Sequence, residues 1–171
     1  MPEASHEFVS ISHFIPETFG EPGQRTFRIN VVSKSSDAKL WLEKQQLAEL
    51  CLTIMQTDEY TKNKDLKDPN NIPENIKQSQ LTYLDFKVFK LAFGYNDQSG
   101  LFIVEAYELD NESPTVRIWI PRKTAIEFAN KGLEIVSAGR PLCDLCENPM
   151  NPEGHACERK NGHSKKGQDI L

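Results

Sequence analysis

The chain has 171 residues, 38% of them hydrophobic, and a net charge of −5, which suits one ordinary domain with a small appendage. This net charge argues against a general nucleic-acid binder, which usually needs a basic face, but leaves room for a local basic patch. No apolar run approaches the roughly 20 residues that span a bilayer, and the N-terminus lacks the basic and apolar regions of a signal peptide. We therefore expect a cytoplasmic protein without a membrane segment, in a compartment where thiols stay reduced.

The first half of the chain predicts three strands followed by a helix. Residues 7–15 read as a short apolar strand, and Gly20-Glu21-Pro22-Gly23 forms a turn. Residues 25–33, rich in β-branched and aromatic side chains, and residues 38–42 give two further strands. Apolar residues at helical spacing then predict an amphipathic helix over about 43–56.

The second half repeats this order after a long interruption. Residues 57–80 are almost wholly polar and lack periodicity, which predicts a long surface loop of the kind that is often mobile or functional. Strands are predicted over 83–93, 101–109 and 115–120. A helix then starts at Pro121, and Gly139 closes it.

The two halves therefore share one order, and in both a tryptophan ends the strand just before the helix. Leu40-Trp41-Leu42-Glu43-Lys44-Gln45 aligns with Ile118-Trp119-Ile120-Pro121-Arg122-Lys123. This similarity indicates either a duplicated βββα unit or a chance likeness of two amphipathic segments. In both cases the fold class is α+β, with an antiparallel sheet carrying two helices on one face. We expect this body to cover residues 1–139, with a small zinc-ribbon-like or knuckle-like module over 140–171.

The C-terminal cysteines predict a zinc site. Cys143 and Cys146 form a Cys-x-x-Cys pair, Cys157 is a third ligand, and His155 or His163 supplies the fourth. Oxygen donors of lower rank are Asp144, Glu147 and Glu153. A redox pair or a cluster of free thiols is the alternative, but a thioredoxin-type pair starts a helix after a strand, whereas this one follows a helix. Four protein ligands leave no open position, so the expected Zn²⁺ is structural.

Several motifs in this order resemble a known bacterial family. They are Gly20-Glu21-Pro22-Gly23-Gln24-Arg25-Thr26-Phe27, Leu42-Glu43-Lys44-Gln45-Gln46, Ala138-Gly139-Arg140-Pro141-Leu142-Cys143-Asp144-Leu145-Cys146, Asn151-Pro152-Glu153-Gly154-His155-Ala156-Cys157 and Arg159-Lys160-Asn161-Gly162-His163. The chain resembles DUF3090, a family of unknown function common in actinobacteria, over nearly its whole length. The family usually has proline where Asp144 stands and glycine where Glu147 stands, which alters the turn without removing a ligand.

The resemblance also implies something about the fourth ligand and about function. The position of His163 can be tyrosine in the family, which favours His155. Family members look like small cytoplasmic proteins that are sometimes encoded beside a kinase-like and a histidine-phosphatase-like protein. That neighbourhood implies a phosphate-related pathway at most.

The sequence favours a protein-interaction or adaptor role over an enzyme. It contains no Ser/His/Asp set, P-loop, dinucleotide glycine motif or kinase signature. The expected partner is therefore another protein. Binding of nucleic acid by the zinc module ranks third, because residues 140–171 carry five basic and five acidic residues and no aromatic side chain for base stacking.

The second hypothesis is an enzyme or a binder of a phosphorylated small molecule or nucleotide. Glu43 and Lys44 lie at a helix start, where backbone N–H groups favour an anion, and Arg25 could grip a phosphate together with Lys44. Ordinary helix capping and solvated basic side chains are the simpler explanation. The candidate ligand-binding residues are Glu21, Arg25, Glu43, Lys44, Gln45 and Glu105.

Overall fold

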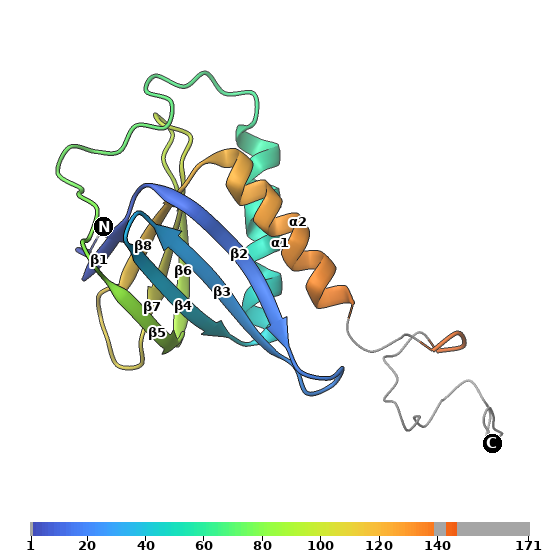
Figure 1. Cartoon of the computed structure of the whole chain (residues 1–171). Coiled ribbons are helices and arrows are strands. Elements are labelled where there is room, and N and C mark those ends of the chain that lie inside the picture. Colours follow the sequence, from blue (N-terminus) through green and yellow to red (C-terminus); the bar gives the residue numbers. More distant parts are fainter. Residues whose placement is uncertain (1, 139–142, 147–171) are drawn as a thin grey trace. The chain divides into compact units, whose positions relative to one another are not determined.

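The computed structural model describes residues 2–138 and 143–146, and these form the predicted α+β fold (Figure 1). One unit comprises residues 1–19 and 26–136, and a second comprises 20–25 and 137–171. In spatial order, sheet A consists of β1 (His6–Phe8), β8 (Val116–Ile120), β7 (Phe102–Tyr107) and β6 (Lys90–Tyr95). Sheet B consists of β2 (Ile11–Phe19), β3 (Thr26–Ser33), β4 (Ser36–Leu42) and β5 (Tyr83–Lys87). The helices are α1 (Lys44–Thr61) and α2 (Arg122–Ser137).

The described strands form two mixed sheets, where the sequence predicts one antiparallel sheet. In each sheet three strands form an antiparallel meander, and a fourth strand pairs in parallel with its last strand. The predicted strand 7–15 is in fact two strands, separated by Val9 and Ser10, and the predicted strand 83–93 is likewise divided at Val88 and Phe89. At each division the chain passes from one sheet to the other, which apolar alternation alone does not reveal.

The chain is consequently built from two ββββα repeats that exchange their first strands. The first repeat runs from β1 to α1 and the second from β5 to α2. β1 joins the meander of the second repeat, while β5 joins that of the first. Trp41 and Trp119 occupy equivalent places: each donates its indole N–H to a carboxylate on the exchanged strand, Asp85 at 2.8 Å and Glu7 at 2.9 Å. The order of strands and helix predicted from the sequence is therefore present in both repeats, with one more strand in each repeat than predicted.

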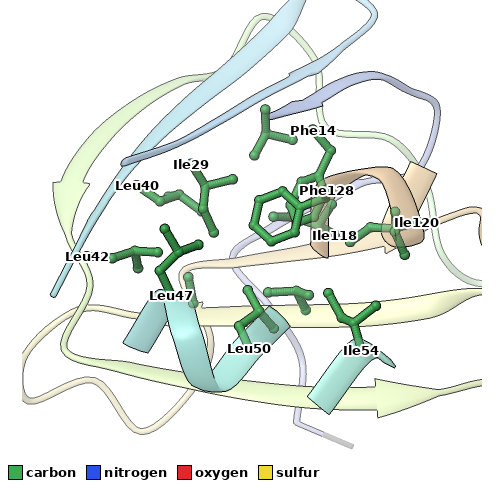
Figure 2. Packing of buried hydrophobic residues seen from close by; sticks show 14 of the residues in the cluster. Phe14, Ile29, Leu40, Leu42, Leu47, Leu50, Ile54, Ile118, Ile120 and Phe128 are labelled. Atoms are coloured by element: carbon green, nitrogen blue, oxygen red, sulfur yellow. The ribbon is translucent and has the colours of Figure 1, made fainter. Parts of the chain in front are cut away.

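The larger of the two hydrophobic clusters among the described residues takes side chains from both sheets and both helices and forms the core. Phe14 and Ile29 of sheet B, Ile118 of sheet A, and helix residues such as Leu47 and Phe128 pack together in this core (Figure 2). Complete burial of large side chains contributes about 1.5–3 kcal/mol each, so this cluster supplies most of the stabilisation of the body.

The two helices meet directly on this core. Gly132 of α2 is buried against Cys51 of α1, and a Cβ at Gly132 would lie only 2.3 Å from the Cys51 sulfur. At another place the Arg122 guanidinium, at the start of α2, pairs with the buried carboxylate of Asp58 near the end of α1. These contacts explain why α1 runs to Thr61, five residues beyond the predicted end, because its last turns pack against the second repeat.

Residues 62–82 connect α1 to β5, and we call them the strap. The sequence predicts a long polar loop over 57–80. In the structure, hydrogen bonds and apolar contacts hold the strap against sheet A. The Asp68 and Asn70 amides donate to the carbonyls of Gln98 and Ser99, both at 2.9 Å. None of the strap's residues is buried. Even so, Ile72 and Ile76 pack over a second apolar cluster formed by Leu101, Ile103 and Trp119.

The strap explains a difference in burial between the two sheets. Every residue of β7 and β8 is buried, because one face meets the core and the other is covered in two ways. The strap covers Ile103 and Trp119, while Glu7 and the Pro2 carbonyl contact Arg117. In β3 and β4 buried and half-buried residues alternate, as expected for a sheet with only one face covered. The outer face of sheet B has no equivalent of the strap among the described residues of the first unit.

Candidate functional site

The Cys143–Cys146 segment forms a turn in the second unit. Cys143 is buried, and its sulfur accepts a hydrogen bond from the Leu145 backbone N–H at 3.4 Å. An N–H group directed at the first sulfur favours a thiolate, and two thiolates from one Cys-x-x-Cys turn suit a tetrahedral zinc ion. The described part of the second unit therefore fits half of the predicted ligand set.

The remaining predicted zinc ligands, His155, Cys157 and the alternative His163, lie outside the described residues. Among the residues that are described, no group of three or more His, Cys, Asp or Glu side chains gathers as a metal site. The zinc prediction thus stays a prediction.

The Gly20–Gly23 turn is present in the second unit as the sequence predicts. Gly20 and Gly23 have positive φ angles of 100° and 91°, and a Cβ on Gly20 would lie 2.7 Å from the Gln24 carbonyl oxygen. Only glycine adopts such a backbone without strain. Glu21 is exposed and Arg25 half-buried at this turn, so the motif residues have at least a structural role here.

Three further candidate residues begin α1. Glu43 and Gln46 form a capping box, in which the Glu43 N–H donates to the Gln46 side chain at 2.8 Å. The Glu43 carboxylate also pairs with Lys87 at 2.7 Å. Gln45 donates to Glu49 one turn later, and Lys44 is exposed. Capping and local pairing account for Glu43 and Gln45, and phosphate binding by this segment stays a prediction.

The sixth candidate, Glu105, lies on β7 of sheet A. It belongs to a buried network around Arg117, which the sequence reasoning missed. The Arg117 guanidinium donates to Glu105 at 2.7 Å and to Glu7 at 2.6 Å, and it also contacts the Pro2 carbonyl. The signal available in the sequence was a single arginine inside the apolar run Val-Arg-Ile-Trp-Ile.

This network orders the sheet. The Arg117 side chain is only 2% exposed, so its charge requires the two carboxylates as partners. Burial and the neighbouring Glu105 carboxylate raise the pKa of the Tyr107 hydroxyl, which keeps that group protonated. Because Glu7 lies on β1 and Arg117 on β8, the ion pair fixes the exchanged strand on its partner sheet. The polar groups of Arg117, Glu7, Glu105 and Tyr107 each form a hydrogen bond or ion pair with another member of the network, which indicates a structural role.

Two grooves of similar size lie at equivalent places in the two repeats. The first, of about 330 Å³, lies between α1 and β6 and includes Leu50 and Phe89 in its walls. The second, of about 320 Å³, lies between α2 and β2 and includes Phe128 and Pro16. Both are at the lower end of the range for small-molecule sites. Their equivalence indicates that they arise from the way each helix packs beside an edge strand of the other sheet.

Comparison with known proteins gives one match. The family model described as "Protein of unknown function (DUF3090)" matches residues 6–157. No curated protein and no solved structure matches the chain. Within the part of the chain that the structure describes, neither helix has the length and apolar character needed to cross a membrane.

Proposed function

Since the chain belongs to the DUF3090 family, whose function is unknown, we propose that it is a zinc-binding protein that acts as a protein-interaction adaptor. Zn²⁺ would be held by Cys143, Cys146, Cys157 and His155, with His163 as the alternative to His155. A closed set of four ligands gives the metal a structural role, in which it stabilises a module too short to bury a core of its own.

The observation that supports zinc binding most directly is the hydrogen bond from the Leu145 N–H to the Cys143 sulfur. Cys51 provides the contrast within the same chain. Its thiol is buried between the two helices, and burial raises its pKa from 9.0 to about 12, so it stays protonated and cannot serve as a ligand.

Metal content and cobalt substitution test this assignment. We expect one Zn²⁺ per chain and, after Co²⁺ exchange, the intense visible absorption of a tetrahedral thiolate site. Cys157→Ala should abolish that spectrum, and Cys51→Ala, the matched control, should leave it unchanged. His155→Ala and His163→Ala then identify the fourth ligand, because only one of them should alter the spectrum. A full-length protein that binds no metal when reduced contradicts the proposal.

The adaptor role is tested separately from metal binding. Affinity purification from native cells should recover a specific partner with the wild-type chain. A variant with both Cys143→Ser and Cys146→Ser should lose this partner if the zinc module presents the binding surface. A Cys51→Ala sample serves as the control for loss of a thiol. Recovery of no partner by any of these proteins would count against an adaptor role while leaving the zinc assignment intact.

A further inference from the structure

The exchanged strands β1 and β5 each lie at one edge of their sheet, and different residues lie beside these two edges. In sheet A the strap forms hydrogen bonds to β1. The Ser79 N–H donates to the Glu7 carbonyl at 2.9 Å, and the Glu7 N–H donates to the Ser79 hydroxyl at 2.9 Å. The Val9 N–H donates to the Gln78 side chain at 2.8 Å. Residues of the strap therefore already occupy this edge.

The equivalent edge of sheet B is β5, which is the last strand of its sheet. The Asp37 amide donates to the Thr82 carbonyl, and the Val88 amide donates to the Trp41 carbonyl, so these even-numbered residues face β4. Because peptide groups alternate in direction along a strand, the N–H groups of Asp85 and Lys87 point to the opposite, outer edge. Asp85 and Lys87 are the equivalents of Glu7 and Val9.

The outer face beside this edge presents aromatic surface and balanced charge. The Arg28 guanidinium lies over the rings of Phe19 and Trp41, 4.7 and 5.0 Å from their centres, and pairs with Glu17 at 2.6 Å. Tyr83 and Phe19 are 70% and 43% exposed.

Two lysines on this face also have acidic partners. Lys39 pairs with Asp37 at 3.5 Å, and Lys87 pairs with Glu43 at 2.7 Å. With these charges paired internally, the face complements uncharged side chains better than a strongly acidic or basic partner.

We propose that the β5 edge and this face bind an extended, uncharged segment of a partner protein by strand addition. The occupied edge of sheet A is the internal template: there the strap adds hydrogen bonds along β1 and packs Ile72 and Ile76 against the cluster that includes Trp119. The partner segment adds to the edge at Asp85 and Lys87 in the same way and covers Trp41 with aliphatic or aromatic side chains. Main-chain hydrogen bonds supply affinity in such complexes, and side chains supply specificity. This inference rests on the proposed adaptor role.

Amide exchange in the isolated full-length protein gives the first test. We expect the Asp85 and Lys87 amides to exchange much faster than the equivalent Glu7 and Val9 amides, measured by NMR. Equal protection of all four in a monomer would mean that residues of the same chain already fill the β5 edge. If protection at Asp85 and Lys87 rises with protein concentration, a second copy occupies it. Either result overturns the proposal.

Peptide selection gives the second test. A phage-displayed library of random dodecapeptides is selected against the full-length, zinc-loaded protein. Lys87→Pro removes the outward N–H at a position where edge strands tolerate proline, and Lys87→Ala keeps the N–H while removing the side chain. Selected peptides should bind wild-type and Lys87→Ala protein alike and bind Lys87→Pro at least tenfold more weakly, and they should protect the Asp85 amide.

Peptides that bind Lys87→Pro as tightly as the wild-type protein, or a selection that enriches none, overturn the proposal. Zinc content is measured on the same samples, so a failure of edge binding is distinguished from a failure of the metal assignment.

Discussion

Replacing Gly132 with alanine tests the closest contact between α1 and α2. The added methyl group would lie 2.3 Å from the Cys51 sulfur, well inside van der Waals distance. Overpacking of this kind typically costs about 1–3 kcal/mol, and an overlap this deep belongs at the upper end. Alanine also favours the helix over glycine by roughly 1 kcal/mol. We therefore expect Gly132→Ala to lower the free energy of unfolding by about 2 kcal/mol.

The same geometry predicts that Cys51→Ala reverses the sign of this effect. Without the sulfur, the atoms nearest to the new methyl group are the Leu47 Cδ1 at 3.6 Å and the residue-51 Cβ at 3.9 Å, which are ordinary contacts. In that background Gly132→Ala should stabilise the protein by up to about 1 kcal/mol through helix propensity. The coupling between the two positions is then roughly 2–3 kcal/mol, within the range measured for residues in contact.

Urea unfolding of the four proteins in this cycle measures the coupling directly. Asn130→Ala, at an exposed position of α2, is the matched control, because it should have the same small effect with or without the Cys51 sulfur. Additive effects of Gly132→Ala and Cys51→Ala would refute the reasoning, since they would show that the helices separate at no cost to relieve the contact.

Three further predictions concern buried polar groups and are each checked by denaturant unfolding. Arg117→Met leaves the buried Glu105 carboxylate and the Glu7 carboxylate, whose side chain is 12% exposed, without their cation and should cost roughly 3–5 kcal/mol, so a loss below about 1 kcal/mol would show that the network adds little. Because only the unfolded chain ionises Cys51 between pH 9.0 and about 12, its contribution to stability should fall as pH rises through this window, by about 1.4 kcal/mol per unit. Stability should therefore decline more steeply above pH 9 in wild type than in Cys51→Ala, and parallel curves would contradict the burial of this thiol. Arg122→Ala leaves the buried Asp58 carboxylate without its guanidinium partner and should lower the free energy of unfolding by about 1–2 kcal/mol. Lys123→Ala, at the exposed neighbouring position, should change it by less than about 0.5 kcal/mol.

Local patterns in the sequence predict most of the elements but not their assignment to sheets. The strands over 26–33 and 36–42 and the turn at Gly20 follow from β-branched residues and glycine, whose preferences act over a few residues. The divisions at Val9 and Val88 carry no such signal, because apolar residues continue on both sides. β2 also continues past residue 15 through Pro16, which an edge strand tolerates because it has no partner on one side.

The candidate site shows a similar division between local and long-range information. The Cys-x-x-Cys turn can be recognised because its chemistry lies within four residues. The Arg117 network could not be assembled from the sequence, because it joins Glu7, Glu105 and Arg117 from three separate strands. From the sequence alone, Glu43 and Gln45 were candidates for ligand binding. In the structure, Glu43 forms a capping box with Gln46, and Gln45 donates a hydrogen bond to Glu49.

The exchanged first strands have a consequence for the order in which the protein is made. β1 leaves the ribosome before the residue that anchors it, because Arg117 follows Glu7 by 110 positions. At synthesis rates of roughly 5–20 residues per second, β1 waits about 5 to 20 seconds before Arg117 has been synthesised. Neither repeat completes its sheet alone, so the body becomes fully folded only once the second repeat has been synthesised. During that interval the residues of β1 lack the strand with which they pair in the folded protein.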